Sequence, residues 1–255
     1  MSEALESPAG PLKEVGREFG FACHPQVECF GVCCRKLDLV LTPYDILRLK
    51  KSLNLSAAEF LEKHTLPADP KRSRWPLLRL KMGSGEEGRC PFLAPEGCLV
   101  YADRPSACRT YPLARASQKD EQGLVTERFF LVEEAHCLGF REEGVWTVEA
   151  WIADQGLIPF HHWNDRWMAI LTHPQGPGEG PSARAKAGMF YLASYNLERF
   201  LEFVSTPKFQ SLFELAPDFF RRAARDQEEI LGLAMDWMNF SFFGEKTMRL
   251  KEGAA

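Results

Sequence analysis

The sequence contains no hydrophobic run that approaches the ~18 apolar residues needed to cross a bilayer. Its first 20 residues also lack the apolar core of a secretory signal peptide. Basic residues are not in surplus, because 31 Lys and Arg stand against 35 Asp and Glu, which gives a formal net charge of −4. Binding to phosphates normally requires excess positive charge. These absences predict a cytoplasmic protein that binds neither a membrane nor nucleic acid.

The short motifs of several common enzyme classes are missing as well. There is no Gly-x-Gly-x-x-Gly nucleotide fingerprint, no phosphate-binding P-loop and no Gly-x-Ser-x-Gly nucleophile elbow. The His-Glu-x-x-His motif and the Cys-x3-Cys-x2-Cys triplet of radical enzymes are also absent. The sequence therefore assigns no catalytic residue, and whether the protein is an enzyme stays open.

Cysteine is what the sequence does supply. Its eight cysteines fall into three groups along the chain, namely Cys23, Cys29, Cys33 and Cys34, then Cys90, Cys98 and Cys108, and finally Cys137. A reducing cytosol disfavours disulfides, so clustered cysteines indicate metal ligands or redox groups. Four converging thiolates also repel one another unless a cation neutralises them. We therefore predict that all eight cysteines are metal ligands, the alternative being scattered cysteines in a packed core.

The spacing of the cysteines bears on the identity of the metal. Zinc ribbons and fingers use Cys-x2–4-Cys pairs, and only Cys29 has partners at that separation, in the adjacent Cys33 and Cys34. Iron–sulfur clusters tolerate irregular gaps, because a cubane presents four iron corners separated in space. The spacing favours a [4Fe–4S] cluster, with zinc as the alternative cofactor. Because neighbouring side chains of extended backbone point to opposite faces, it stays open whether Cys33 and Cys34 both ligate, and in one site or two.

Local signals predict the elements of the first part of the chain. Thr42 followed by Pro43 predicts the start of a helix, and Ser56 with Glu59 forms the capping box of a second helix. Residues 77–80 and 89–92 flank a Gly-Ser-Gly tip and predict a hairpin. Residues 124–132 carry Val, Thr and two Phe, which predicts a further short strand.

Beyond Cys137 the pattern becomes helical. Helices are predicted from a cap at Thr147, over 161–171, and over the apolar stripes within 189–204 and 220–238. A Gly- and Pro-rich tract at 173–188 predicts a linker-like loop. The fold class is therefore α+β and predominantly helical, with a cysteine-rich half of short strands and a helical C-terminal half. The predicted divisions are a polar leader at 1–18, a cysteine-cluster metal-binding domain at 19–145 and a helical region at 146–255.

Two stretches carry a resemblance to a known family. CHPQVECFGVCC, followed by CPFLAPEGCLVYADRPSACRTYP, resembles the YkgJ-like cysteine-cluster family of zinc- or iron-chelating domains, of the CxxCxxCC type. The resemblance covers about residues 21–137 and implies that these cysteines bind metal. The gap of five residues between Cys23 and Cys29 is longer than in shorter-spaced members, so Cys23 is the least securely placed of the first four.

The residues beside the cysteines have more than one interpretation. Arg104 and Arg109 flank Cys108, and they either donate hydrogen bonds to thiolate or sulfide or bind backbone carbonyls. His24 and His136 each stand beside a cysteine and are candidate substitute ligands.

Three hypotheses of function follow. The first is an iron–sulfur protein that uses its cluster for electron transfer with a redox partner or to assist a reaction. The second is a zinc protein in which the metal sites have a structural role and the helical half binds a protein partner. The third rests on resemblance alone: flagellin lysine N-methylases carry a similar domain, which implies an enzyme resembling protein-lysine N-methylases.

Overall fold

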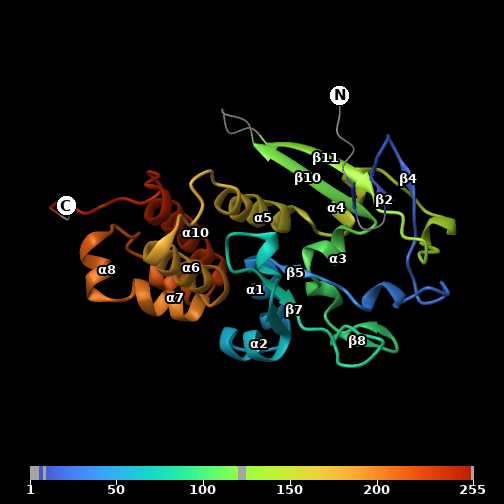
Figure 1. Cartoon of the computed structure of the whole chain (residues 1–255), viewed down its shortest axis with the longest axis horizontal. Helices are drawn as coiled ribbons and strands as arrows, with labels where there is room; N and C mark the ends of the chain where they lie inside the picture. The colour runs from blue at the N-terminus through green and yellow to red at the C-terminus, as the bar shows by residue number, and fades with distance from the viewer. Residues whose placement is uncertain (1–5, 8–9, 120–124, 254–255) are drawn as a thin grey trace. The chain divides into compact units, whose positions relative to one another are not determined.

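The structure is a computed structural model that describes residues 6–7, 10–119 and 125–253 (Figure 1). The described residues form ten α-helices and several small sheets of short strands, which confirms a predominantly helical α+β fold. None of the described helices is long and apolar enough to cross a membrane. The chain packs as two units, which we call the cysteine unit (1–39 with 82–162) and the helical unit (40–81 with 163–255). All eight cysteines belong to the cysteine unit.

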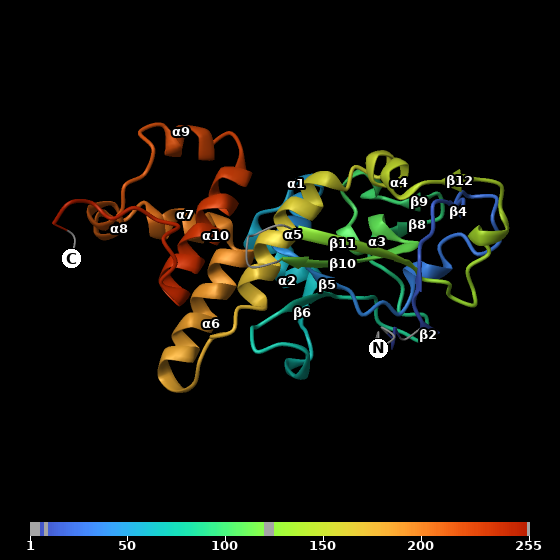
Figure 2. The same cartoon turned by 90° about the horizontal axis from the view of Figure 1, so that it is seen from above.

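Short antiparallel strands build the cysteine unit. Its longest hairpin joins β10 (Leu113–Lys119) to β11 (Val125–Leu131), and β3 (Lys13–Glu14) pairs with the other edge of β11 (Figure 1). The strand predicted for 124–132 is thus confirmed over its described residues, since Leu124 lies outside them. Three pairs of shorter strands complete the unit. β1 (Glu6–Ser7) pairs with β2 (Gly10–Pro11). β4 (Phe19–Gly20) pairs with β12 (Val145–Trp146), and β8 (Leu93–Ala94) pairs with β9 (Gly97–Cys98) (Figure 2).

An aromatic cluster around Phe21 forms the core of this unit. The Phe21 side chain is only 2% exposed, and its ring meets those of Tyr111, Phe140 and Trp151 edge-on at centroid distances of 5.3–5.8 Å. The indole nitrogen of Trp146 donates to the Phe21 carbonyl oxygen over 2.9 Å. Edge-to-face aromatic packing adds to the gain from burying these rings. The chain is therefore fixed two residues before Cys23.

Two helices of the cysteine unit begin at local sequence signals. α4 (Val148–Asp154) starts after Thr147, whose hydroxyl accepts from the Ala150 amide over 3.2 Å. α3 (Ser106–Thr110) starts after Pro105. α5 (Ile158–Leu171) begins three residues before the predicted 161 and ends as predicted. This unit also holds three short 3-10 helices, η1 (Val32–Cys34), η3 (Tyr101–Asp103) and η4 (Gly139–Arg141), and a fourth, η2 (Pro70–Arg72), lies in the helical unit.

The first part of the helical unit holds two capped helices. α1 (Pro43–Ser52) and α2 (Ala57–His64) carry the predicted caps, because Thr42 and Ser56 each accept from the backbone amide three residues on. β5 (Val40–Leu41), β7 (Leu78–Leu80) and β6 (Thr65–Pro67) form a sheet in that order.

The hairpin predicted between 77–80 and 89–92 is wrong. β7 pairs with β5 and β6 instead, and this pairing leaves Leu78 and Leu80 only 5% and 1% exposed. Arg89 forms an isolated bridge with Arg35. Burial of the two leucines explains the choice, because a strand pairs where its apolar face is covered.

Five further helices complete the helical unit, namely α6 (Gly180–Tyr195), α7 (Leu197–Val204), α8 (Pro207–Leu212), α9 (Phe219–Ala223) and α10 (Gln227–Phe243). Figures 1 and 2 both show α6 and α7 against α10. Trp75 stacks on Phe190 of α6 and Phe242 of α10, with ring centroids 4.7 and 5.4 Å apart. The loop predicted for 173–188 ends earlier than expected, because α6 already begins at 180. Pro181 lies in the first turn, where a missing amide costs no hydrogen bond, and alanines follow it.

Candidate metal centre

Backbone contacts bring the first cysteines of the chain to the last one. The Ala22 amide donates to the Gly139 carbonyl over 3.0 Å, so the segment that carries Cys23 runs beside the segment that follows Cys137. The Leu138 amide donates to Cys29 Sγ over 3.2 Å. The sulfur of Cys33 is close enough that its charge acts on both Cys23 and Cys137. We call Cys23, Cys29, Cys33 and Cys137 the first thiol cluster.

A second set of contacts gathers cysteines from two other segments. The Cys90 amide donates to the Cys34 carbonyl over 2.8 Å, and the Leu93 amide donates to the Cys90 carbonyl over 3.1 Å. Leu93 is in turn the strand partner of Cys98 in the β8–β9 pair. We call Cys34, Cys90 and Cys98 the second thiol group. The thiols of Cys33 and Cys34 hydrogen-bond to each other, so the two sets adjoin at this pair.

Cys108 lies half-buried on α3. Its neighbour Arg109 donates to the carbonyls of Ala102 and Arg104, which ties α3 to the stretch that follows Cys98. The described contacts therefore place Cys108 on a helix anchored to the segment of the second thiol group.

Backbone amides are directed at several of the sulfurs. Three cysteine sulfurs each accept a hydrogen bond from the backbone amide two residues later in the chain. The donors are Phe92 for Cys90, Val100 for Cys98 and Gly139 for Cys137. An N–H donor stabilises a thiolate, and in metal centres such donors tune the sulfur ligands. The sequence did not predict these donors, because a backbone amide has no side-chain signature. The one available hint was the glycine two residues after Cys137.

Five of the thiols have a raised pKa, which favours their protonated form. Burial raises the pKa of the Cys90, Cys98 and Cys137 thiols above the ordinary value. Burial, followed by the charges of neighbouring thiolates, raises the pKa of Cys23 to about 11. The hydrogen bond that the Cys33 thiol donates to Cys34 raises the pKa of Cys33, and burial adds to that shift. A metal that binds here must therefore displace protons, as is general for cysteine ligands.

Arg104 and Arg109 are almost completely buried, with 9% and 7% of their surfaces exposed. Arg109 donates to the Gln155 carbonyl over 2.5 Å as well as to carbonyls of its own segment, so for this residue the backbone interpretation is confirmed. Arg104 donates to the Tyr101 carbonyl over 2.9 Å and to the Gln155 side chain, both neutral. Its charge lowers the pKa of Cys23 and of Cys98, against the larger effect of burial. Arg104 therefore acts electrostatically on both sets of thiols.

Three other side chains near the cysteines have defined partners. The Tyr111 hydroxyl is buried beside Cys137 and has no hydrogen-bond partner within normal geometry in the described part of the chain. His24 contacts Gln26 over 2.8 Å and Glu142 over 3.3 Å. His136 lies 3.5 Å from Glu134. Both imidazoles are thus engaged by side chains other than the cysteines, whereas Tyr111 is a neighbour of the first thiol cluster.

Over residues 6–7, 10–119 and 125–253, no three His, Cys, Asp or Glu side chains stand as a group that could hold a metal ion without rearrangement. The assignment of the eight cysteines as ligands stays a prediction. The donor set fits a metal chemically, because soft thiolates suit zinc and iron–sulfur clusters.

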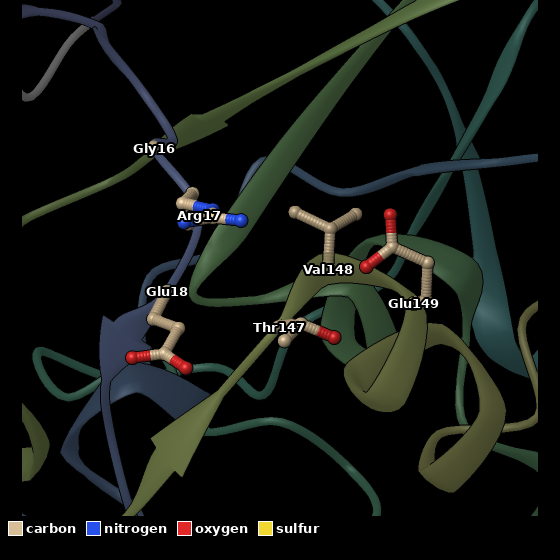
Figure 3. A pocket seen from close by; sticks show the side chains of 6 residues that line it. All are labelled: Gly16, Arg17, Glu18, Thr147, Val148 and Glu149. Carbon is tan, nitrogen blue, oxygen red and sulfur yellow. The ribbon is translucent and has the colours of Figure 1, made fainter.

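A separate pocket of about 540 Å³ lies between Gly16–Glu18 and the start of α4, where it is lined by Thr147, Val148 and Glu149 (Figure 3). Its lining contains no cysteine. The side chains that Figure 3 labels bear charges of both signs, from Arg17, Glu18 and Glu149. The residues that line this pocket therefore differ from those that form the thiol clusters.

Comparison with known proteins gives one match. Residues 22–138 match the family model described as "CxxCxxCC: Putative zinc- or iron-chelating domain". No curated protein and no solved structure matches the chain. The matched range contains all eight cysteines and agrees with the resemblance seen in the sequence. Residues 22–138, less than half of the chain, are therefore similar to this cysteine-cluster family of zinc- or iron-chelating domains, and the match supports metal binding by this part of the chain.

Proposed function

We propose that the cysteine unit holds iron and sulfide as an iron–sulfur cluster, with [4Fe–4S] as the favoured form. The observation that carries the proposal is the first thiol cluster, in which Cys23, Cys29 and Cys33 meet Cys137 from the far end of the unit. Four thiols from two distant segments supply the soft donors that a cluster with four iron corners needs.

Two further features support iron–sulfur over zinc. Only Cys29 has partners at the spacing of a zinc-binding pair, in the adjacent Cys33 and Cys34, and the four cysteines after position 34 come from separate segments. Backbone amides point at the sulfurs of four cysteines, and Arg104 adds a nearby positive charge. Both features favour the negative charge that the sulfur atoms of a cluster carry; the four cysteines are Cys29, Cys90, Cys98 and Cys137. Hydrogen bonds to sulfur and nearby positive charge raise the reduction potential of a cluster.

The function that follows is one-electron transfer with a redox partner protein in the reducing cytoplasm. When bound, the cluster supplies the redox couple. The chain supplies the thiolates, the amide donors and the buried guanidinium of Arg104. A structural zinc site would need the same thiolates but no redox couple, so spectroscopy separates the two.

The test is anaerobic purification followed by metal and acid-labile sulfide analysis and absorption spectroscopy. The proposal predicts brown protein with iron, sulfide and a broad band near ~400 nm that bleaches on reduction with dithionite. Colourless protein with stoichiometric zinc and no sulfide would contradict it. His136→Ala is the matched control, because its imidazole contacts Glu134 and the variant should keep the full spectrum.

A further inference from the structure

Apolar side chains are exposed beside two of the cysteines. Leu99 follows Cys98 and is 71% exposed, and Tyr101, two residues later, is 61% exposed. Val32, which precedes Cys33, is 40% exposed. Scattered exposed apolar residues are normal on a protein surface, whereas several that gather at one place indicate a surface that binds a partner.

The exposed side chains come from two segments that pack on each other. A Cβ on Gly97 would lie 3.2 Å from the Phe30 ring, and a Cβ on Gly31 would lie 3.3 Å from the Leu93 side chain. Residues 30 and 31 therefore lie against the β8–β9 pair (Figure 2). Each of the two segments continues directly into the exposed residues. We call Val32, Leu99 and Tyr101 the Leu99 surface.

Tyr101 is held in place although most of its surface is exposed. The Arg104 guanidinium lies 3.8 Å from the centroid of the Tyr101 ring, and the same side chain donates to the Tyr101 carbonyl over 2.9 Å. Arg104 is almost completely buried and also donates to Gln155. A cation–π contact thus fixes the ring while its outer face stays open to solvent. A rigid aromatic side chain loses little freedom on binding, which is typical of the residues that dominate protein interfaces.

Charge is divided unequally between the two units. The cysteine unit carries 19 Asp and Glu against 11 Lys and Arg, a formal net charge of −8, whereas the helical unit carries 16 against 20, a net charge of +4. Close in sequence to the Leu99 surface, Glu28 and Glu96 are exposed. Arg35, three residues after Val32, pairs with Glu87 over 2.8 Å. An acidic surface of this kind attracts a basic protein and speeds its approach.

We propose that the Leu99 surface docks a basic one-electron carrier protein beside Cys33 and Cys98. The inference deepens the proposed function and rests on it for the electron, although the surface itself does not depend on the metal. In the transfer the carrier gains the one electron that the metal centre loses, and no bond forms or breaks. Electron transfer slows steeply with distance, so a carrier has to dock beside the ligands.

The charge of the cysteine unit disfavours other occupants of this surface. A net charge of −8 repels the phosphates of a nucleic acid and the headgroups of an anionic membrane. A second copy of the chain would bring the same negative charge to the surface. A basic protein gains from both the charge and the apolar side chains.

Cytochrome c, a strongly basic one-electron carrier, is the probe that tests the inference on the anaerobic full-length protein. Isothermal titration calorimetry measures its binding, and stopped-flow absorbance measures electron transfer from reduced protein freed of excess dithionite. Both should weaken about ten-fold or more between ~0.01 M and ~0.1 M ionic strength, over which the Debye length falls from about 30 to about 10 Å. Flavodoxin, an acidic carrier, should bind more weakly than cytochrome c at low salt.

Leu99→Ser should weaken the binding of cytochrome c about ten-fold at low salt, because the interface loses an apolar anchor. Tyr101→Ser is the second variant and should act in the same direction, since it lies farther from Cys98. Val145→Ser is the matched control, because Val145 is 72% exposed in the same unit and lies outside the Leu99 surface. Metal analysis of each variant should show that the metal is retained.

The inference is overturned if cytochrome c does not bind, if its binding does not depend on salt, or if flavodoxin binds as tightly. It is also overturned if Leu99→Ser and Tyr101→Ser bind cytochrome c as tightly as Val145→Ser does. Self-association of the wild-type chain that Leu99→Ser abolishes, measured by sedimentation, would assign the surface to a second copy and contradict the inference. Binding of cytochrome c without electron transfer would refute the proposed function and leave the docking surface supported.

Discussion

The two units of this chain are held together in different ways. Of the twelve largest fully buried side chains, only Leu157 and Phe160 belong to the cysteine unit, and the other ten lie in the helical unit. The cysteine unit has short strands and small sheets, and its cysteines are exposed or half-buried. A unit with few large buried side chains must gain stability from another source. We therefore expect metal binding to stabilise the cysteine unit, whereas apolar burial stabilises the helical unit.

Removal of the metal should have the largest effect on the difference in stability between the two units. Binding free energies of structural metals reach ~10 kcal/mol, and in such sites that free energy is folding free energy. Anaerobic treatment with a chelator and a reductant should therefore unfold residues 82–162 while 180–243 stay folded. Hydrogen exchange followed by mass spectrometry measures both segments in one sample. Equal loss of protection in both segments, or in neither, would contradict the difference between the units.

Phe190→Ala tests the helical unit. Phe190 is fully buried and stacks on Trp75, so truncation should lower the free energy of unfolding by about 3–5 kcal/mol. Urea titration followed by circular dichroism measures the loss. Metal content per folded chain should not change, because the ligands lie in the other unit. A variant that loses its metal in proportion to its helical stability would show that the two units do not separate as described.

Gly139→Ala should have a smaller effect, directed at the cysteine unit. An added Cβ at Gly139 would lie 2.7 Å from the Ala22 carbonyl oxygen and 2.7 Å from the Phe21 ring. Overpacking of this kind costs about 1–3 kcal/mol and should separate Cys23 from Cys137, so metal is lost more rapidly to a chelator. Gly188→Ala is the control, because a Cβ there meets nothing within 4 Å in helix α6. Chelation at the same rate in both variants would contradict a close approach at Gly139.

Tyr195→Phe should have the smallest effect and depend on pH. Burial raises the pKa of the Tyr195 phenol, so its contribution to folding is present below pH ~10 and is lost as pH rises above that value. Wild-type protein should therefore lose about 1.4 kcal/mol more than the variant between pH 8 and pH 11. Urea unfolding of both proteins at the two pH values measures the difference. If the free energy of unfolding changed equally with pH in both proteins, the fold would not be keeping Tyr195 from ionising.

Local parts of the fold could be predicted from the sequence, and parts that depend on distant pairing could not. The caps at Thr42, Ser56 and Thr147 follow from side chains that reach amides three residues away. The partner of Leu78 and Leu80 depends on which strands cover them, and the sequence wrongly suggested the next segment. Residues 40–81 lie within the matched family range, yet they pack with the C-terminal helices.

In the candidate site, too, local chemistry could be predicted from the sequence and long-range contacts could not. Cysteine spacing was enough to predict metal binding and the family, because thiolates carry their chemistry in the side chain. The approach of Cys90 and Cys137 to the segment of Cys33 and Cys34 depends on long-range contacts, which no local pattern encodes. The amide donors and the orientation of Tyr111 toward Cys137 likewise come only from the fold.

X-ray absorption spectroscopy of the anaerobic protein tests the central claim most directly, because it identifies the metal and its neighbours together. The account predicts an iron edge with sulfur neighbours and a short iron–iron scattering path, which a cluster requires. We also expect Cys29→Ser with Cys137→Ser to lower the iron signal, because both thiols belong to the first thiol cluster. A zinc edge with four sulfur neighbours at ~2.3 Å and no metal–metal path would contradict the iron–sulfur assignment.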